Sequence, residues 1–221
     1  MMSFTQFAPV WFYGFDVAFE LAFAVVSLIV AIFAFRIHKA TDQRNVQLFG
    51  IAFLLVSVSY FVQSLFNFLM ISKANENICQ VLKIQSILLF NALGAYTHMI
   101  FMTLGLVVLT YMVLKTENKE ALWLLSVVSL LSIFFASNRI YMFFLMSSVY
   151  LVFLTWHFVE NYLHNRQTKT LLVAIAFLFL LFGSSHFLVA VNHQLFYVIG
   201  HILELVAYMF ILWNFVLVRK K

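Results

Sequence analysis

The sequence contains few charged residues, one proline and one cysteine. Only 10% of its 221 residues are charged, whereas 65% are hydrophobic, and the mean hydropathy is +1.02. Soluble domains contain about 25% charged residues, so a water-soluble fold is excluded. Cys79 alone cannot form an intramolecular disulfide or a Cys-x-x-Cys motif. With Pro9 as the sole proline, long apolar helices can run without interruption.

Seven apolar runs lie between short polar connections, and most are long enough to cross a hydrocarbon core of about 30 Å as helices. The connections leave no room for an extramembrane domain. We therefore predict that residues 1–221 form one all-α transmembrane domain, a bundle of seven helices. The predicted spans are 10–37, 46–72, 81–114, 121–137, 140–163, 170–191 and 195–218.

The basic residues predict the orientation of the bundle, because Lys and Arg near span ends stay on the cytoplasmic side. Ten of the thirteen fall in alternate connections or at the C-terminus: Arg36, Lys39, Arg44, Lys115, Lys119, Arg166, Lys169, Arg219, Lys220 and Lys221. The N-terminus is thus predicted outside and the C-terminus inside. The net charge of +5 becomes an orientation signal, so we expect membrane lipids and no nucleic acid as partners. We expect a multi-pass protein of a prokaryotic plasma membrane, with no cleaved signal peptide.

A short repeat adds a topological prediction. The letters Ile-Ala-Phe-Leu occur at 51–54, where the second span begins, and again at 175–178, where the sixth begins. This pattern favours a 3+1+3 parallel repeat, in which spans 1 to 3 correspond to spans 5 to 7.

Ionisable residues inside membrane spans are costly and usually mark function. Five of them lie about 15 to 18 residues from the basic residue at the cytoplasmic end of their helix, which is roughly 23–27 Å along the axis, and Asp16 lies one turn further out. The five are Glu20, His98, His186, His201 and Glu204. We therefore predict one polar layer in the outer part of the bundle.

Spacing within the helices supports this layer. Asp16 and Glu20 at i, i+4 share a helix face, as do His201 and Glu204 at i, i+3. We expect four further polar residues at a similar height to line the same pocket: Tyr60, Gln63, Ser147 and Ser148. Tyr197, at the outer end of its span, is interpreted as an interface anchor.

The layer has several functional interpretations. Imidazole and carboxylate are ligands for divalent metals, so the leading hypothesis is a zinc, iron or copper site formed by His98, His186, His201, Glu20, Glu204 and Asp16. Such a site could act on a lipid or a small lipophilic molecule, and whether the protein is an enzyme is left open. Alternatives are a non-catalytic sensor with a pH- or ligand-responsive pocket, a b-type haem with two axial histidines, a transporter of small solutes or protons, and hydrogen bonding that only joins helices.

Several seven-helix families are excluded by missing residues. A retinal Schiff base needs a lysine within the last span, and the only lysines near it, Lys220 and Lys221, follow its end. The third span ends Thr110-Tyr111-Met112 rather than with the Asp/Glu-Arg-Tyr motif of G-protein-coupled receptors, and Asn-Pro-x-x-Tyr is missing from the seventh. Ceramidase-like hydrolases carry a late His-x-x-x-His pair, but here only His201 and Glu204 stand at that place.

The segments Tyr197–Glu204 and Tyr13–Asp16, with Glu20, carry a family resemblance. The chain resembles seven-helix membrane proteins of archaeal type, which bring no function to transfer. It is also similar to the sensor modules fused to some signalling enzymes. We expect no kinase or cyclase domain after Lys221, so this resemblance implies a separate signalling partner on the cytoplasmic face.

Overall fold

The computed structural model describes residues 9–74, 84–116, 118–190 and 193–219, which form seven α-helices and no strand. A short 3-10 turn, Val10–Phe12, leads into the first helix. The helices are α1 (Tyr13–Thr41), α2 (Arg44–Ala74), α3 (Ile84–Val113), α4 (Lys119–Phe135), α5 (Arg139–Asn165), α6 (Thr168–Ala190) and α7 (Gln194–Arg219). The prediction of an all-α membrane protein is confirmed at this level, and each helix corresponds to one predicted apolar run.

Six of the helices in the described ranges are long and apolar enough to cross a membrane: α1, α2, α3, α5, α6 and α7. The exception is α4, which has 17 residues. At about 1.5 Å per residue it measures roughly 26 Å, less than the hydrocarbon core of about 30 Å. The structure therefore gives a multi-pass membrane protein with six membrane-length helices and a shorter seventh.

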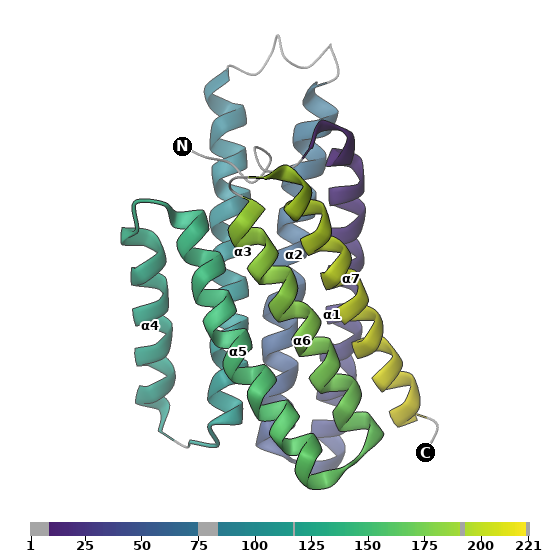
Figure 1. The fold of residues 1–221 in the computed structure, drawn as a ribbon. Coiled ribbons are helices and arrows are strands. Elements are labelled where there is room, and N and C mark those ends of the chain that lie inside the picture. The colour runs from purple at the N-terminus through teal and green to yellow at the C-terminus, as the bar shows by residue number, and fades with distance from the viewer. Residues whose placement is uncertain (1–8, 75–83, 117, 191–192, 220–221) are drawn as a thin grey trace.

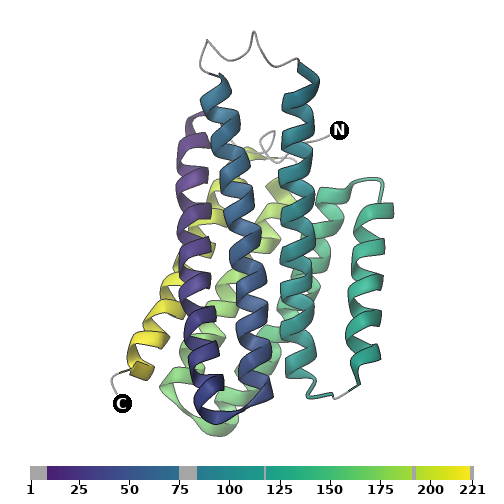
Figure 2. The same cartoon turned by 180° about the vertical axis from the view of Figure 1, so that it is seen from behind.

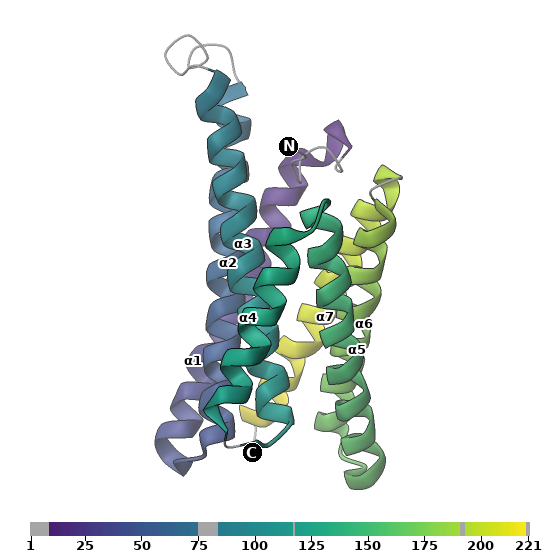
Figure 3. The same ribbon diagram turned by 90° about the vertical axis from the view of Figure 1, so that its left-hand side faces the viewer.

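The helices pack as two layers of three, with α4 at one side (Figure 3). Helices α1, α2 and α3 lie side by side, as do α5, α6 and α7, because the main contacts join neighbours in sequence within each group. The layers contact each other at their edges, where α1 meets α7 and α3 meets α5. Figure 1 shows α4 packed outside, against α3 and α5, and Figure 2 shows the α1–α3 layer in front. The two layers therefore pack less closely against each other than neighbouring helices pack within each layer.

The two ends of the bundle differ in charge. The N-terminal end, where α1 and α7 begin, is at the top of Figure 1, and the C-terminal end, where both helices end, is at the bottom. At the C-terminal end the chain turns through Asp42, Lys115 and Arg166, whose φ angles are 51°, 51° and 50°. Helix C-termini usually place Gly in this left-handed conformation, but here polar residues occupy it. The described members of the ten basic residues all lie in these turns or adjoining helix ends.

Polar side chains join neighbouring helices inside each layer. Ser57 Oγ donates to the Ala24 carbonyl at 2.8 Å, which links α2 to α1. Ser148 and Ser184 hydroxyls lie 3.0 Å apart and link α5 to α6. In lipid the hydrophobic effect does not drive helices together, so close packing and such hydrogen bonds hold them.

Glycine permits the closest approach between α6 and α7. A Cβ atom added at Gly200 would lie 2.7 Å from the Phe187 ring, and one added at Gly183 would lie 3.1 Å from both Glu204 Cγ and the Gly200 carbonyl oxygen. Small residues at such crossings are typical of membrane helices. These two glycines therefore fix how near α7 lies to α6, and with it the position of Glu204.

We expect Gly200→Ala to destabilise the bundle by about 1–3 kcal/mol, because the added methyl group overlaps a buried ring. Gly14→Ala is the matched control: a Cβ atom there would meet nothing within 4 Å, so its effect should be near zero or slightly stabilising. The free energy of unfolding in lipid bicelles, measured by steric trapping, checks both. Equal effects of the two substitutions would contradict the close approach of α6 and α7.

Candidate functional site

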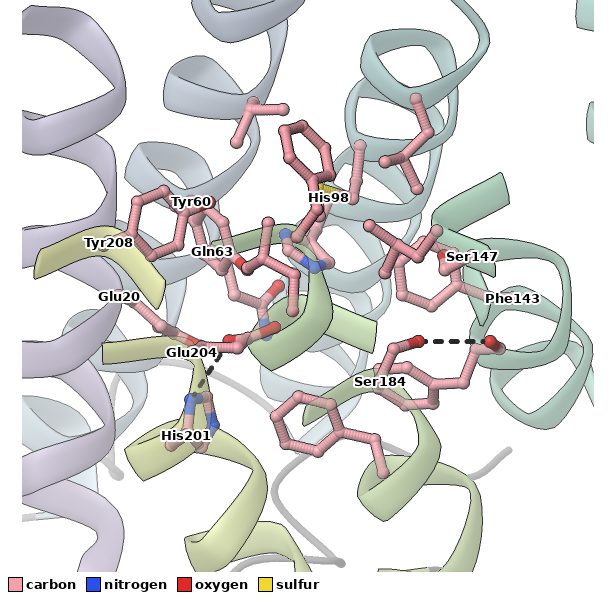
Figure 4. Close-up of a pocket in the computed structure, with 18 of the residues that line it drawn as sticks. Glu20, Tyr60, Gln63, His98, Phe143, Ser147, Ser184, His201, Glu204 and Tyr208 are labelled. Atoms are coloured by element: carbon pink, nitrogen blue, oxygen red, sulfur yellow. Dashed lines mark hydrogen bonds and ion pairs between the residues drawn. The ribbon is translucent and has the colours of Figure 1, made fainter. Parts of the chain in front are cut away.

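A cavity lies between the two layers. Its wall is built by the six membrane-length helices, and α4 contributes none of the described residues that line it. Figure 4 shows Glu20, Gln63, Glu204 and His201 on one side of the cavity and Ser147 and Ser184 on the other. The cavity is therefore lined by six helices rather than formed between two.

Five helices contribute a stripe of lining residues and α1 contributes Glu20, and most of the polar members lie in the half of the cavity nearer the N-terminal end. On α7 the stripe is Tyr197, His201, Glu204 and Tyr208, at i, i+4, i+7 and i+11. On α3, His98 is followed toward the C-terminal end by Met102, Leu106 and Leu109. The stripes of α2 and α6 likewise continue past Tyr60 and Ser184 to apolar residues, which are Phe53, Val56, Phe177 and Leu180. The cavity thus has a polar end and an apolar body.

Asp16 joins the first helix to the last beside this polar end. Its Oδ1 lies 3.0 Å from His201 Nε2, and the Tyr197 hydroxyl donates to both carboxylate oxygens at 3.0 Å. All three residues are buried. Phe12, Phe19, Phe23 and Phe187 place their rings around the His201 imidazole. This arrangement fixes His201 from α1 and leaves its other nitrogen, Nδ1, directed at Glu204.

The two glutamates of the polar end have different partners. Glu20 accepts from Asn67 Nδ2 at both oxygens, at 3.0 and 2.9 Å, which links α1 to α2. Glu204 Oε2 lies 3.8 Å from His201 Nδ1, too far for a hydrogen bond (Figure 4). Both glutamates are buried and line the cavity. Glu204 is therefore the carboxylate better placed to receive a ligand group.

His98 is fixed by the neighbouring helix α2. The Ser59 hydroxyl donates to the His98 carbonyl at 3.0 Å and lies 2.8 Å from His98 Nδ1. The single hydroxyl hydrogen goes to the carbonyl, so Nδ1 is the donor to Oγ. Ser59 is fully buried and does not line the cavity, so it is not placed to attack a ligand.

The structure brings most of the predicted polar residues together. Seven line the cavity: Glu20, Tyr60, Gln63, His98, Ser147, His201 and Glu204. Asp16 and Ser148 lie directly behind it: Asp16 contacts His201, and Ser148 is hydrogen-bonded to Ser184. The exception is His186.

His186 lies on a different face of α6 from the cavity. The lining residues of that helix are Phe177, Leu180, Ser184 and Phe187, and His186 falls off this stripe because each residue turns the helix by about 100°. Its Nδ1 lies 2.7 Å from the Phe182 carbonyl one turn earlier. The distance of His186 from the cytoplasmic end of its helix predicted its height in the bundle. That distance does not specify on which face of the helix the side chain lies.

Within the described residues, no group of three or more His, Cys, Asp or Glu side chains is arranged to hold a metal ion. The predicted ligands are instead engaged with protein groups: Asp16 with Tyr197, Glu20 with Asn67 and His98 with Ser59. The metal site and the haem stay predictions from the sequence.

Three contributors were not singled out from the sequence. Asn67 and Ser59 hold Glu20 and His98 in place, and Tyr197, interpreted as an interface anchor, is buried and bonded to Asp16. The signal for Tyr197 was its i, i+4 spacing to His201 on the same helix face. Asn67 and Ser59 carried only the general signal of a polar residue inside a span.

Comparison of the chain with protein-family models, curated proteins and solved structures finds no match. The function is therefore argued from the cavity and the residues around it.

We expect Asp16→Asn to lower the free energy of unfolding by about 1.5–3 kcal/mol, because it replaces the buried carboxyl group that accepts from Tyr197 and contacts His201. Tyr197→Phe should also cost about 1.5–3 kcal/mol, because it removes the donor of the same bond. Since the two residues share one interaction, the double variant should cost less than the sum by about 1 kcal/mol. Thermal and steric-trapping measurements in bicelles check this, with exposed Glu160→Gln as the control. Additive losses from Asp16→Asn and Tyr197→Phe would contradict the bond that joins α1 to α7.

Proposed function

We propose that the protein is a multi-pass membrane receptor that binds a lipophilic small molecule in the cavity between its two helix layers, without catalysing a reaction itself. The observation that carries this is the cavity lined by six helices, with a polar end and an apolar body. Ligand sites typically have an apolar lining and a few convergent polar groups.

The arrangement of the polar groups favours binding over catalysis. Ser59, the serine bonded to His98, is fully buried and lies outside the cavity wall. His201 is held between Asp16 and Glu204, and none of the described hydroxyl groups donates to or accepts from its ring nitrogens. A nucleophile and base facing a substrate are what a hydrolase would require.

The proposal includes the finer topology predicted from the sequence. In this topology the protein lies in the plasma membrane and α4 is a short seventh span. The N-terminal end faces outside and the basic C-terminal end faces the cytoplasm. A separate signalling partner binds at that basic end. The 3+1+3 repeat pairs Phe53 with Phe177; both are buried, and both line the cavity between the layers and a second one near the C-terminal end.

Ligand binding can be tested by filling the cavity. Ser147 is buried and lines the wall, so we expect Ser147→Phe to abolish saturable photolabelling by a dodecyl alcohol that carries a diazirine, with the full chain in phosphatidylcholine nanodiscs. In the wild-type protein, mass spectrometry should place the adducts on cavity residues of α5, α6 and α7. Val149→Phe is the matched control, because Val149 is exposed on the same helix and should leave labelling unchanged. Non-saturable labelling confined to exposed residues such as Trp156 and Trp213 would refute the receptor function.

The proposed orientation can be tested with the single cysteine. Cys79 is predicted to lie in an outer connection, so a membrane-impermeant maleimide added to intact cells should label the wild-type protein. In a Cys79→Ser background, Gln43→Cys moves the thiol to the turn between α1 and α2, which is exposed, and should be labelled only after the cells are permeabilised. The reverse pattern would invert the orientation and leave the cavity unaffected.

A further inference from the structure

The polar end of the cavity carries two carboxyl groups with no lysine or arginine among the described lining residues. The two carboxyl groups belong to Glu20 and Glu204. Asp16, next to them, is bonded to Tyr197 and paired with His201. A buried carboxylate is costly unless a counter-charge and hydrogen bonds compensate it.

The protein partners of the two glutamates do not supply this compensation. Asn67, which donates to both oxygens of Glu20, is a neutral amide. Glu204 has the neutral Tyr60 hydroxyl as a hydrogen-bond partner and the His201 ring at 3.8 Å, and that ring contacts Asp16 on its other side. A cationic donor placed in the cavity would therefore give Glu204 a charged partner that the described lining lacks.

One acceptor at this end faces the cavity without a partner. Gln63 Oε1 makes no hydrogen bond within the described part of the chain, its side chain lines the wall, and the residue is only 4% exposed. The Ser147 hydroxyl across the cavity (Figure 4) is also unpaired among the described residues, but it can donate as well as accept. A buried acceptor left unpaired is costly, so the Gln63 oxygen is a second, independent sign that a donor group is missing.

Aromatic rings complete the same end. Tyr60, Phe143 and Tyr208 all line the cavity, and Tyr60 packs edge-on against Tyr208 at 6.0 Å between ring centroids. Aromatic faces attract alkylammonium groups through their quadrupoles, and this attraction strengthens where water is excluded.

We propose that the ligand is a lipophilic amine. Its ammonium group lies against Glu204 and Glu20 and donates to Gln63, and its apolar chain runs between the layers toward Leu109 and Phe177 at the far end of the cavity. This inference rests on the proposed receptor function and adds the chemical class of the ligand.

The test compares three competitors of matched chain length, dodecylamine, dodecanol and dodecanoic acid, for displacement of the photoreactive dodecyl alcohol. Wild-type protein and Glu204→Gln are both measured in phosphatidylcholine nanodiscs. Each competitor partitions into the lipid to the same extent with either protein. The ratio of its half-displacement concentration for Glu204→Gln to that for the wild type is therefore independent of partitioning. We expect Glu204→Gln to weaken dodecylamine about tenfold or more, since a hydrogen bond between charged groups contributes about 1.5–3 kcal/mol, and to leave dodecanol within about twofold.

Two variants serve as controls. Glu20→Gln should also weaken the amine, which keeps the test decisive if Glu204→Gln fails to fold, and Glu160→Gln, an exposed glutamate outside the cavity, should change nothing. If the amine is weakened no more than the alcohol in both cavity variants, the amine class is wrong, while saturable labelling by the alcohol still supports the receptor. If no competitor displaces the probe from a labelled cavity in the wild-type protein, or labelling is not saturable, the receptor function itself fails.

Discussion

The contact between Asp16 and the pair Tyr197 and His201 is the interaction on which the rest of the arrangement depends. It joins α1 to α7, the first helix of one layer to the last helix of the other, at one of the two edges where the layers meet. In hydrocarbon a carboxyl group cannot hydrogen-bond to water, so its hydrogen-bond partners must lie inside the bundle. Asp16 thereby closes the edge of the cavity and turns His201 Nδ1 toward Glu204.

The same constraint explains why polar residues appear at nearly every helix contact. Asn67 secures Glu20, Ser59 secures His98, and Ser148 meets Ser184. Each of these bonds satisfies a buried group and at the same time sets the rotation of a helix. The glycines at 183 and 200 then let α6 and α7 approach closely enough for Glu204 to reach the interior. Function and folding therefore draw on the same small set of polar and small residues.

The cavity follows from how the two layers meet. Because contact between them is concentrated at the edges, the middle helices α2 and α6 leave space that side chains fill only in part. Polar residues gather at the N-terminal end of this space and apolar ones along the rest. Such a shape suits an elongated molecule with one polar end, and the two glutamates with the unpaired Gln63 oxygen indicate what that end should carry. The short helix α4 contributes none of the described residues of the cavity wall and packs against α3 and α5 from outside.

The hydropathy of the sequence alone determined where the helices lie. In lipid, the backbone N–H and C=O groups of such apolar segments are hydrogen-bonded when each segment forms a helix. The sequence also determined the height of the polar layer, since rise per residue is fixed. The sequence could not determine which way each side chain points: His186 shares the height of His201 but lies off the cavity face of its helix, whereas Tyr197, Asn67 and Ser59 turned out to be partners of the layer. Rotation about a helix axis is set by packing and by hydrogen bonds to residues far away in the chain, such as Asp16 to Tyr197, so only the tertiary structure decides it.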